Sequence, residues 1–290
     1  MPNGIIIIDK PSDWTSMDVC AKLRGIFREK RIGHAGTLDP MATGILPVFV
    51  GRATRAVEFT EDYDKEYVAG LRLGVVTNTQ DTTGEILEEK PVTVTREDVE
   101  KALERFRGSI EQIPPMYSAI KIGGKKLYEL ARKGKEVERR PRSITIRELE
   151  LVEQVSETEY ILRVSCSKGT YVRTLCHDIG QALGCGGTMS SLRRTRVGPF
   201  REGVTLEQVQ QAADSQQAAG MLAAVDGCFA HLPQLQATER ECAKFIRNGT
   251  PYPCQEQEGE YRVYSPDGAF MMLGRVENGQ MTTVKSFFEV

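Results

Sequence analysis

Residues 33–44 of the chain read GHAGTLDPMATG, a stretch that combines glycines with a histidine, an aspartate and a proline. Its three glycines permit sharp turns and close approach of the backbone to a ligand. Pro40 pushes the preceding residue towards an extended backbone, so we expect Asp39 on a stiff loop outside any helix. The residues alone leave three interpretations of its carboxylate: a nucleophile, a general base, or an Asp–Pro turn whose side chain caps the local backbone.

Short apolar runs flank this loop on both sides. Residues 4–8 read GIIII and residues 45–51 read ILPVFVG, and each run predicts a buried strand. Between the first run and the loop, Thr15 and Asp18 have the spacing of a capping box, which predicts the start of a helix. The apolar stripe of that helix consists of Val19, Leu23, Ile26 and Phe27.

The remainder mixes strands and helices without strict alternation, which is typical of an α+β fold with a largely antiparallel sheet. The predicted strands are Tyr67–Val76, Ser118–Ile122, Ser143–Val152, Tyr160–Cys166 and Met189–Val197. The predicted helices are Arg96–Arg107, Lys126–Lys133, Tyr171–Leu183, Leu206–Ala213 and Thr238–Arg247. Short runs separated by Gly, Pro and Asp follow the last helix, so the tail reads as a small, strand-rich module.

Composition excludes several classes of protein. The 290 residues can bury a sizeable core, and no stretch approaches the roughly 20 apolar residues of a membrane helix. Seven cysteines without a C-x-x-C pair, and the lack of a secretory leader, indicate reduced thiols in the cytoplasm. The sequence has no nucleotide-binding Gly-rich motif, and His177-Asp178 lacks the partners of a metal site, so we expect neither cofactor nor metal.

Charge is distributed unevenly along the chain, although the net charge is only −2. Residues 202–290 carry 6 basic and 12 acidic side chains, whereas residues 121–147 carry ten basic and three acidic ones. Tyr117 and Tyr128 lie within or beside the basic segment. Clustered cations with nearby aromatic rings suit a phosphate backbone and unstacked bases. The alternative is a solvated basic face with no partner.

Four segments together carry a resemblance to a known family. They read IDKP at residues 8–11 with Thr15-Ser16 following, GHAGTLDPMATG at 33–44, CSKGTYVRTL at 166–175 and LRRTRVGPF at 192–200. In this order and spacing they resemble the signatures of the TruB family of tRNA pseudouridine synthases. The resemblance runs from the first predicted strand to Phe200 and is weak in the tail.

The resemblance implies a fold and a domain organisation. Residues 1–230 would form a pseudouridine synthase catalytic domain with a mixed, mainly antiparallel sheet. A thumb-like basic insertion would occupy residues 117–142, approximately. Residues 231–290 would form a small β-rich, PUA-like domain that binds RNA. The acidity of that tail departs from the RNA-binding expectation.

It also implies an activity: isomerisation of the T-loop uridine, position 55, of tRNA to pseudouridine. The base must be flipped out of its stack, the N1–C1′ bond broken, and the uracil rejoined through C5. This chemistry requires no cofactor. The implied partner is the T-arm of tRNA, bound by a monomer in the cytoplasm without membrane contact. Asp39 takes the catalytic role, and attack on the base, attack on the ribose and proton transfer all remain open.

The resemblance assigns roles to five further residues, each with a plainer interpretation. Arg173 would hold the catalytic carboxylate by a charge-assisted contact, with bidentate geometry one option, rather than form a surface ion pair. Tyr67 would stack on the flipped uracil rather than only cover the core. His34 would lie near the extruded base rather than in an ordinary turn. Lys10 would support the active-site loop rather than be an exposed charge. Leu192 would form an apolar pocket wall, a role compatible with its plainer interpretation as an ordinary core residue.

Two other functions remain open at this stage. One is a guide-RNA-dependent or ribosomal pseudouridine synthase of the same superfamily, which works with small partner proteins. The other is a non-catalytic chaperone that binds and refolds tRNA. The combined presence of Asp39, Tyr67 and Arg173 argues against binding alone, because binding needs no such set.

Overall fold

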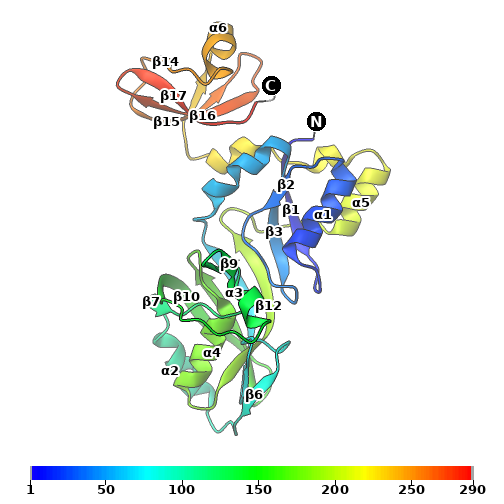
Figure 1. Ribbon diagram of the computed structural model, residues 1–290, viewed down its shortest axis with the longest axis vertical. Coiled ribbons are helices and arrows are strands. Elements are labelled where there is room, and N and C mark those ends of the chain that lie inside the picture. Colours follow the sequence, from blue (N-terminus) through cyan, green and yellow to red (C-terminus); the bar gives the residue numbers. More distant parts are fainter. Residues whose placement is uncertain (1, 289–290) are drawn as a thin grey trace.

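The computed structural model describes residues 2–288, which form an elongated molecule with two separate main sheets (Figure 1). The larger sheet has eight strands, in the order β1-β3-β12-β4-β11-β10-β7, with β2 paired to β3. Its strands are β1 Gly4–Lys10, β2 Ile32–His34, β3 Thr43–Val50, β4 Lys65–Leu73, β7 Gly108–Gln112, β10 Arg142–Gln154, β11 Glu159–Cys166 and β12 Gly187–Val197. The contact of β12 with β3 is parallel and the other pairings are antiparallel, which confirms the mixed, mainly antiparallel prediction.

Four helices pack against this sheet: α1 Ser16–Phe27, α2 Arg96–Glu104, α4 Val172–Ala182 and α5 Leu206–Asp214. Helix α1 begins at the predicted capping box, because Thr15 and Asp18 each bond the other's backbone N–H. Its buried stripe packs with α5 against β1 and β3. Helices α2 and α4 contribute to a second core with β4, β10, β11 and β12.

Strand β12 joins the two halves of the sheet. Most of its length pairs with β4, whereas Arg193 and Arg194 also pair with Thr43 and Gly44 of β3. The loop at residues 35–42 leads directly into β3 at this join. The informative stretch of the sequence therefore lies where two separately packed cores meet.

Two predicted strands are wrong in extent. The run Tyr67–Val76 is interrupted at Gly74, whose φ of +85° ends β4 and starts β5, Val75–Thr77. Strand β5 leaves the main sheet and pairs with β6, Ile86–Glu89. Of the predicted strand Ser118–Ile122 in the basic insertion, only Lys121–Ile122 (β8) is a strand, and it pairs with β9, Lys125–Lys126. The following helix α3 is shorter than predicted, at Leu127–Ala131, because this segment buries little apolar surface beyond Leu127.

The tail forms its own five-stranded sheet at one end of the molecule, in the order β13-β15-β16-β17-β14 (Figure 1). The strands are β13 Gln234–Gln236, β14 Tyr252–Pro253, β15 Gly259–Tyr264, β16 Phe270–Glu277 and β17 Gln280–Ser286. The predicted helix there consists of α6, Glu239–Glu241, followed by a π-helical turn over Cys242–Ile246. Phe229 contacts Phe270 and Phe287, so this module packs on the part of the molecule that contains the larger sheet, through an aromatic cluster. Among residues 2–288, no helix is long and apolar enough to span a membrane.

Candidate active site

Lys10 holds the loop that carries Asp39 in place. This lysine is fully buried, contrary to the plain interpretation of an exposed charge. Its Nζ donates to the carbonyl oxygens of Trp14 at 2.6 Å and Pro40 at 3.1 Å. Burial lowers the pKa of Lys10 to about 8. Ser16, the first residue of α1, bonds both the amide (2.9 Å) and the carbonyl (3.2 Å) of Leu38. The residues on both sides of Asp39 are therefore fixed.

Arg194 fixes the start of the same loop. Its Nη2 donates to the Gly36 carbonyl at 2.9 Å, and its Nε donates to the Ile45 carbonyl at 2.7 Å. Gly44 has a φ of +102°, and a Cβ there would lie 2.2 Å from the Arg194 carbonyl oxygen. Only glycine permits this close approach of β3 and β12. Rigidity of the loop thus comes from buried contacts as well as from Pro40.

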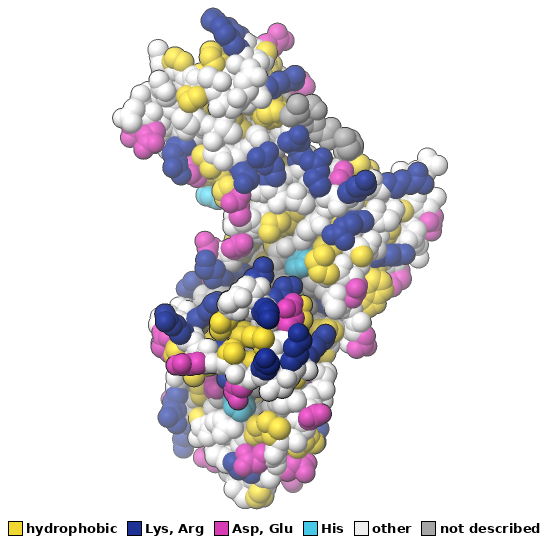
Figure 2. Space-filling view, in the orientation of Figure 1, with side chains coloured by type: hydrophobic (Ala, Val, Ile, Leu, Met, Phe, Trp, Pro, Cys, Tyr) yellow, Lys and Arg dark blue, Asp and Glu magenta, His cyan; other side chains and the backbone are white. Residues whose placement is uncertain are grey.

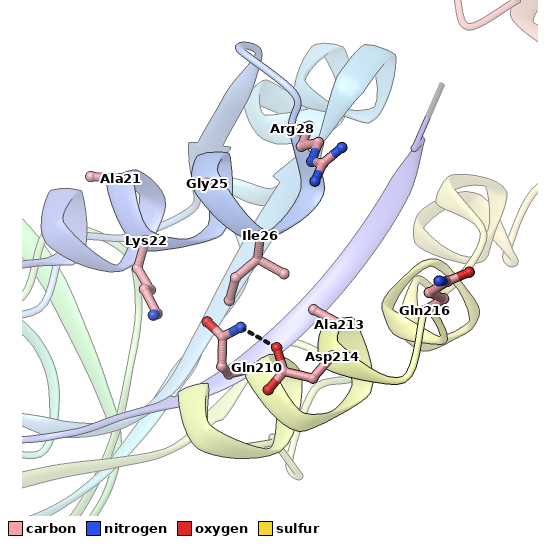
Figure 3. Close-up of a pocket in the computed structure, with 9 residues that line it drawn as sticks. All are labelled: Ala21, Lys22, Gly25, Ile26, Arg28, Gln210, Ala213, Asp214 and Gln216. Carbon is pink, nitrogen blue, oxygen red and sulfur yellow. Dashed lines mark hydrogen bonds between the residues drawn. The ribbon is translucent and has the colours of Figure 1, made fainter.

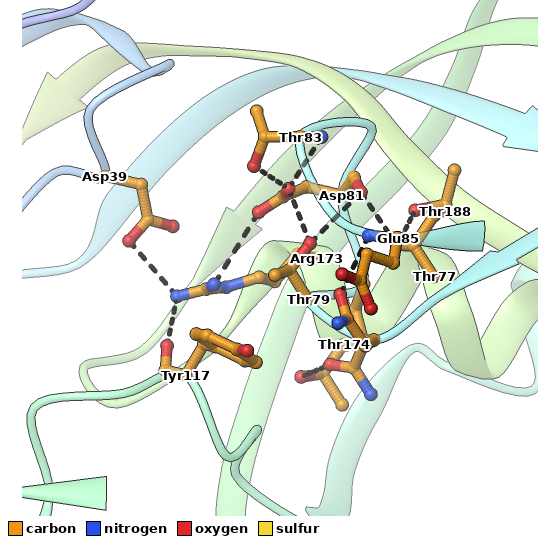
Figure 4. Close-up of polar contacts among 12 residues, drawn as sticks. Asp39, Thr77, Thr79, Asp81, Thr83, Glu85, Tyr117, Arg173, Thr174 and Thr188 are labelled. Carbon is orange, nitrogen blue, oxygen red and sulfur yellow. Dashed lines mark hydrogen bonds and ion pairs between the residues drawn. The ribbon is translucent and has the colours of Figure 1, made fainter. Parts of the chain in front are cut away.

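Asp39 faces Arg173 in the first turn of α4 (Figure 4). Arg173 Nη2 lies 3.1 Å from Asp39 Oδ1 and also donates to the Tyr117 carbonyl at 2.8 Å. Arg173 Nη1 lies 3.6 Å from Oδ2 of Asp81. The contact with Asp39 is therefore single and not bidentate, because the guanidinium is shared between two carboxylates and a backbone carbonyl.

Asp81 is a site residue that sequence reasoning missed. It lies in the turn between β5 and β6 and is 4% exposed. Its Oδ1 accepts bonds from the Thr79 hydroxyl at 2.8 Å and the Thr83 amide at 3.0 Å. In the sequence, a polar run of Thr, Gln and Asp before Gly84 indicates only a turn. Its pairing with Arg173 becomes visible only in three dimensions.

Gln112 is a second residue that the sequence did not reveal. The N-cap of α4, Tyr171, makes no side-chain capping bond. Instead, the amide side chain of Gln112 accepts from the Tyr171 N–H at 2.9 Å and donates to its carbonyl at 3.1 Å. Gln112 is 2% exposed and ends β7. These two hydrogen bonds fix the start of α4, from which the Arg173 side chain reaches Asp39.

The electrostatics of Asp39 balance opposing effects. Burial raises the pKa of its carboxyl, and the nearby Asp81 raises it further. The charges of Arg173 and Lys10 act in the opposite direction. The side chain is still 33% exposed, whereas that of Arg173 is 8% exposed. Asp39 therefore belongs to a largely buried ionic network, but its own side chain is accessible to a ligand.

Apolar and aromatic residues line the same region. Tyr67 on β4 and Leu192 on β12 are each 9% exposed and share a core cluster with Leu38. Burial raises the pKa of the Tyr67 phenol. His34 ends β2 instead of lying in a turn, and burial together with Arg194 lowers the pKa of its imidazole. Its Nδ1 is buried without a hydrogen-bond partner among residues 2–288. The structure therefore brings Tyr67 and Leu192 into one core and places His34 at the start of the Asp39 loop.

The basic insertion presents its charges to solvent. Lys126 Nζ and the Arg132 guanidinium lie 5.4 and 5.6 Å from the ring centroid of Tyr128. Lys121, Lys125 and Lys133 are exposed, with no carboxylate of residues 2–288 within 4 Å. Figure 2 shows Lys and Arg side chains gathered over the middle of this face, around the insertion. The Tyr117 carbonyl connects the base of the insertion to Arg173.

A groove of about 660 Å³ between α1 and α5 is separate from this site (Figure 3). Its lining includes Lys22, Arg28, Gln210 and Asp214 but none of the predicted site residues. Within the part of the chain that the structure describes, no group of three His, Cys, Asp or Glu side chains could hold a metal ion.

Known proteins match nearly the whole chain. The model of the TruB family pseudouridylate synthase N-terminal domain matches residues 24–172, and that of the tRNA pseudouridylate synthase B C-terminal domain matches residues 173–230. The tRNA pseudouridine synthase B of Azoarcus sp. (strain BH72) is 43% identical over 281 residues, covering 96% of this chain and 93% of its relative. That of Stutzerimonas stutzeri (strain A1501) is 44% identical over 287 residues, with the same coverage.

Solved structures agree on the fold. A chain in the crystal structure of an archaeal box H/ACA Nop10–Cbf5 complex superposes with a TM-score of 0.71 at 25% identity, covering 99% of this chain and 86% of that one. A chain of a Cbf5–Nop10–Gar1 complex superposes equally well at 26% identity, covering 98% and 85%. With two family models spanning residues 24–230 and relatives above 40% identity, the chain belongs to the TruB family of pseudouridylate synthases.

Proposed function

We propose that this protein isomerises the uridine at position 55 in the T-loop of tRNA to pseudouridine, with Asp39 as the carboxylate that acts on the reacting nucleoside. The assignment of Asp39 as the reacting carboxylate rests on the geometry of its loop. In a member of this family, an accessible carboxylate is held 3.1 Å from a buried arginine, on a loop pinned by Lys10, Ser16 and Arg194. Such fixed geometry is what distinguishes a reacting group from a solvated one.

The reaction is a redox-neutral isomerisation. The N1–C1′ bond breaks, the uracil turns, and a C5–C1′ bond forms; C5 loses its proton and N1 gains one. Asp39 is ionised when it acts, and Arg173 favours that form. Tyr67 offers an aromatic face to the flipped base, Leu192 an apolar wall, and His34 an uncharged ring at the entrance of the loop.

Binding of the RNA is assigned to the segment that carries the free charges. Residues 117–142 act as a thumb whose lysines and arginines neutralise phosphates of the T-arm. Tyr128, flanked by two cations, supplies a stacking surface. Residues 231–290 form a PUA-like domain with a lesser share in binding, because its charge is acidic.

The proposal is tested by mapping pseudouridine in an unmodified tRNA transcript after incubation with the purified protein alone. A parallel reaction uses a T-arm hairpin with no other protein or RNA added. We expect pseudouridine at the T-loop uridine in both substrates. Modification that requires a guide RNA and partner proteins would instead place this chain in the guide-dependent class. Tight binding of tRNA without any modification would support the chaperone function.

A further inference from the structure

Arg194 has the largest side chain among those that are less than 2% exposed. It lies on β12, opposite Tyr67 of β4 and beside Gly44 of β3, at the join between the two cores. The proposed reaction uses it only to hold the loop that carries Asp39, and not for any interaction with the nucleoside. A guanidinium is rarely buried without a carboxylate partner, because its desolvation is costly.

The partners of Arg194 are neutral. It donates to the carbonyls of Gly36 and Ile45, and no carboxylate of residues 2–288 lies within 4 Å of it. Its charge is therefore compensated by backbone dipoles alone, and its positive potential reaches the neighbouring side chains. It lowers the pKa of His34, and it opposes the rise that burial causes in the pKa of Tyr67.

Arg194 and Tyr67 are directly opposite each other on β12 and β4, so their side chains lie side by side on one face of the sheet. A guanidinium has donors and no acceptor, so it can approach the phenolic oxygen only as a donor to one of its lone pairs. In that arrangement the single O–H of Tyr67 is free to donate elsewhere. Through the Gly36 carbonyl, the same guanidinium also sets the distance between the Tyr67 ring and the loop that carries Asp39.

We propose that Arg194 is a positioning residue for the isomerisation: it ties the Asp39 loop to Tyr67 and presents the phenol to the flipped uracil as a hydrogen-bond donor. This role rests on the proposed function, in which Tyr67 faces the base. The permanent charge also stabilises negative charge on the phenolic oxygen whenever its proton is shared with the substrate. A lysine at this position would supply a charge but not a planar fork that bonds the Gly36 and Ile45 carbonyls together beside Tyr67.

The test is a double-mutant cycle between Arg194→Lys and Tyr67→Phe, read as the single-turnover rate of pseudouridine formation. We expect Arg194→Lys to slow the wild-type background by about tenfold, with tRNA affinity within threefold. In the Tyr67→Phe background the same change should cost less than twofold, because its target hydroxyl is absent. Arg163→Lys, at an exposed arginine of β11, is the matched control and should leave both rates unchanged.

A second readout needs no RNA, so it separates this inference from the proposed function. Difluorotyrosine placed at position 67 is titrated by ¹⁹F NMR in the wild-type and Arg194→Gln backgrounds. Loss of the neighbouring positive charge should raise the titration midpoint. If Arg194→Gln fails to fold, the kinetic cycle with lysine decides alone. Equal rate losses in both Tyr67 backgrounds, or an unmoved midpoint in folded Arg194→Gln, would overturn the role of Arg194. A wild-type protein that forms no pseudouridine would instead refute the proposed function.

Discussion

The loop at residues 33–44 and the thumb at residues 117–142 both bring charge to the same site, but they hold it differently. Asp39 is fixed through buried contacts of its neighbours with Lys10, Ser16 and Arg194. Four of the thumb's five lysines are exposed, and none of the five has a carboxylate partner within 4 Å in the described chain. The two segments meet at Arg173, which contacts both Asp39 and the Tyr117 carbonyl. Fixed charge suits chemistry on one atom, whereas free charge suits a diffuse phosphate backbone.

We expect the largest effect on the reaction rate from a substitution in the loop at residues 33–44. Asp39→Asn keeps the shape of the side chain but removes its charge, so tritium release from C5-labelled uridine in tRNA should fall at least about a thousandfold. A filter-binding assay should show tRNA affinity close to that of the wild type. Asp214→Asn, at the end of α5, serves as the matched control and should retain full activity. Activity near wild type in the Asp39 variant would refute its assignment.

Asp81→Asn should have the next largest effect. It removes the second carboxylate that holds Arg173, so the guanidinium is free to leave its present orientation. We expect a loss of about 10- to 100-fold in the single-turnover rate, with little change in tRNA affinity. An unchanged rate would mean that Gln112 and the Tyr117 carbonyl position Arg173 without help.

The pH dependence of the rate tests the electrostatic effect of Asp81 on Asp39. Burial raises the pKa of Asp39 and the active form is ionised, so the rate should fall as the pH decreases through a value above the ordinary aspartate pKa of about 3.9. Asp81 contributes to this rise. In Asp81→Asn the acid limb of the single-turnover profile should therefore move to lower pH. Movement to higher pH would contradict the electrostatic account of the site.

The smallest effect on chemistry is expected at the thumb. The double variant Lys125→Gln with Lys133→Gln should weaken tRNA binding about three- to tenfold at moderate salt. It should also reduce the slope of log Kd against log salt by about 0.7 to 0.9 per removed charge. The rate at saturating enzyme should stay close to wild type. Lys101→Gln with Arg105→Gln, at exposed positions in the last turn and at the C-cap of α2, removes the same charge elsewhere and should leave the slope unchanged.

The sequence was informative wherever a local pattern determined local structure. The capping box at Thr15 and the apolar runs before and after the loop predicted α1, β1 and β3. The motifs also identified Asp39 and Arg173 as a pair. Asp81, Gln112 and Arg194 act through partners more than fifty positions away, a relation that composition and spacing do not contain. In the thumb, predicted elements were too long, because few tertiary contacts there extend the local preference.

The central claim is that the fixed charge of Asp39 serves catalysis and the free charges of the thumb serve binding. The most direct test compares Asp39→Asn with the Lys125→Gln and Lys133→Gln double variant in one experiment. Both are assayed for tRNA dissociation constant and for single-turnover rate of pseudouridine formation at saturating enzyme. We expect the Asp39 variant to lose the rate and keep the affinity, and the thumb variant to lose affinity and keep the rate. If both variants lost the same quantity, the separation between a fixed catalytic charge and a free binding charge would be contradicted.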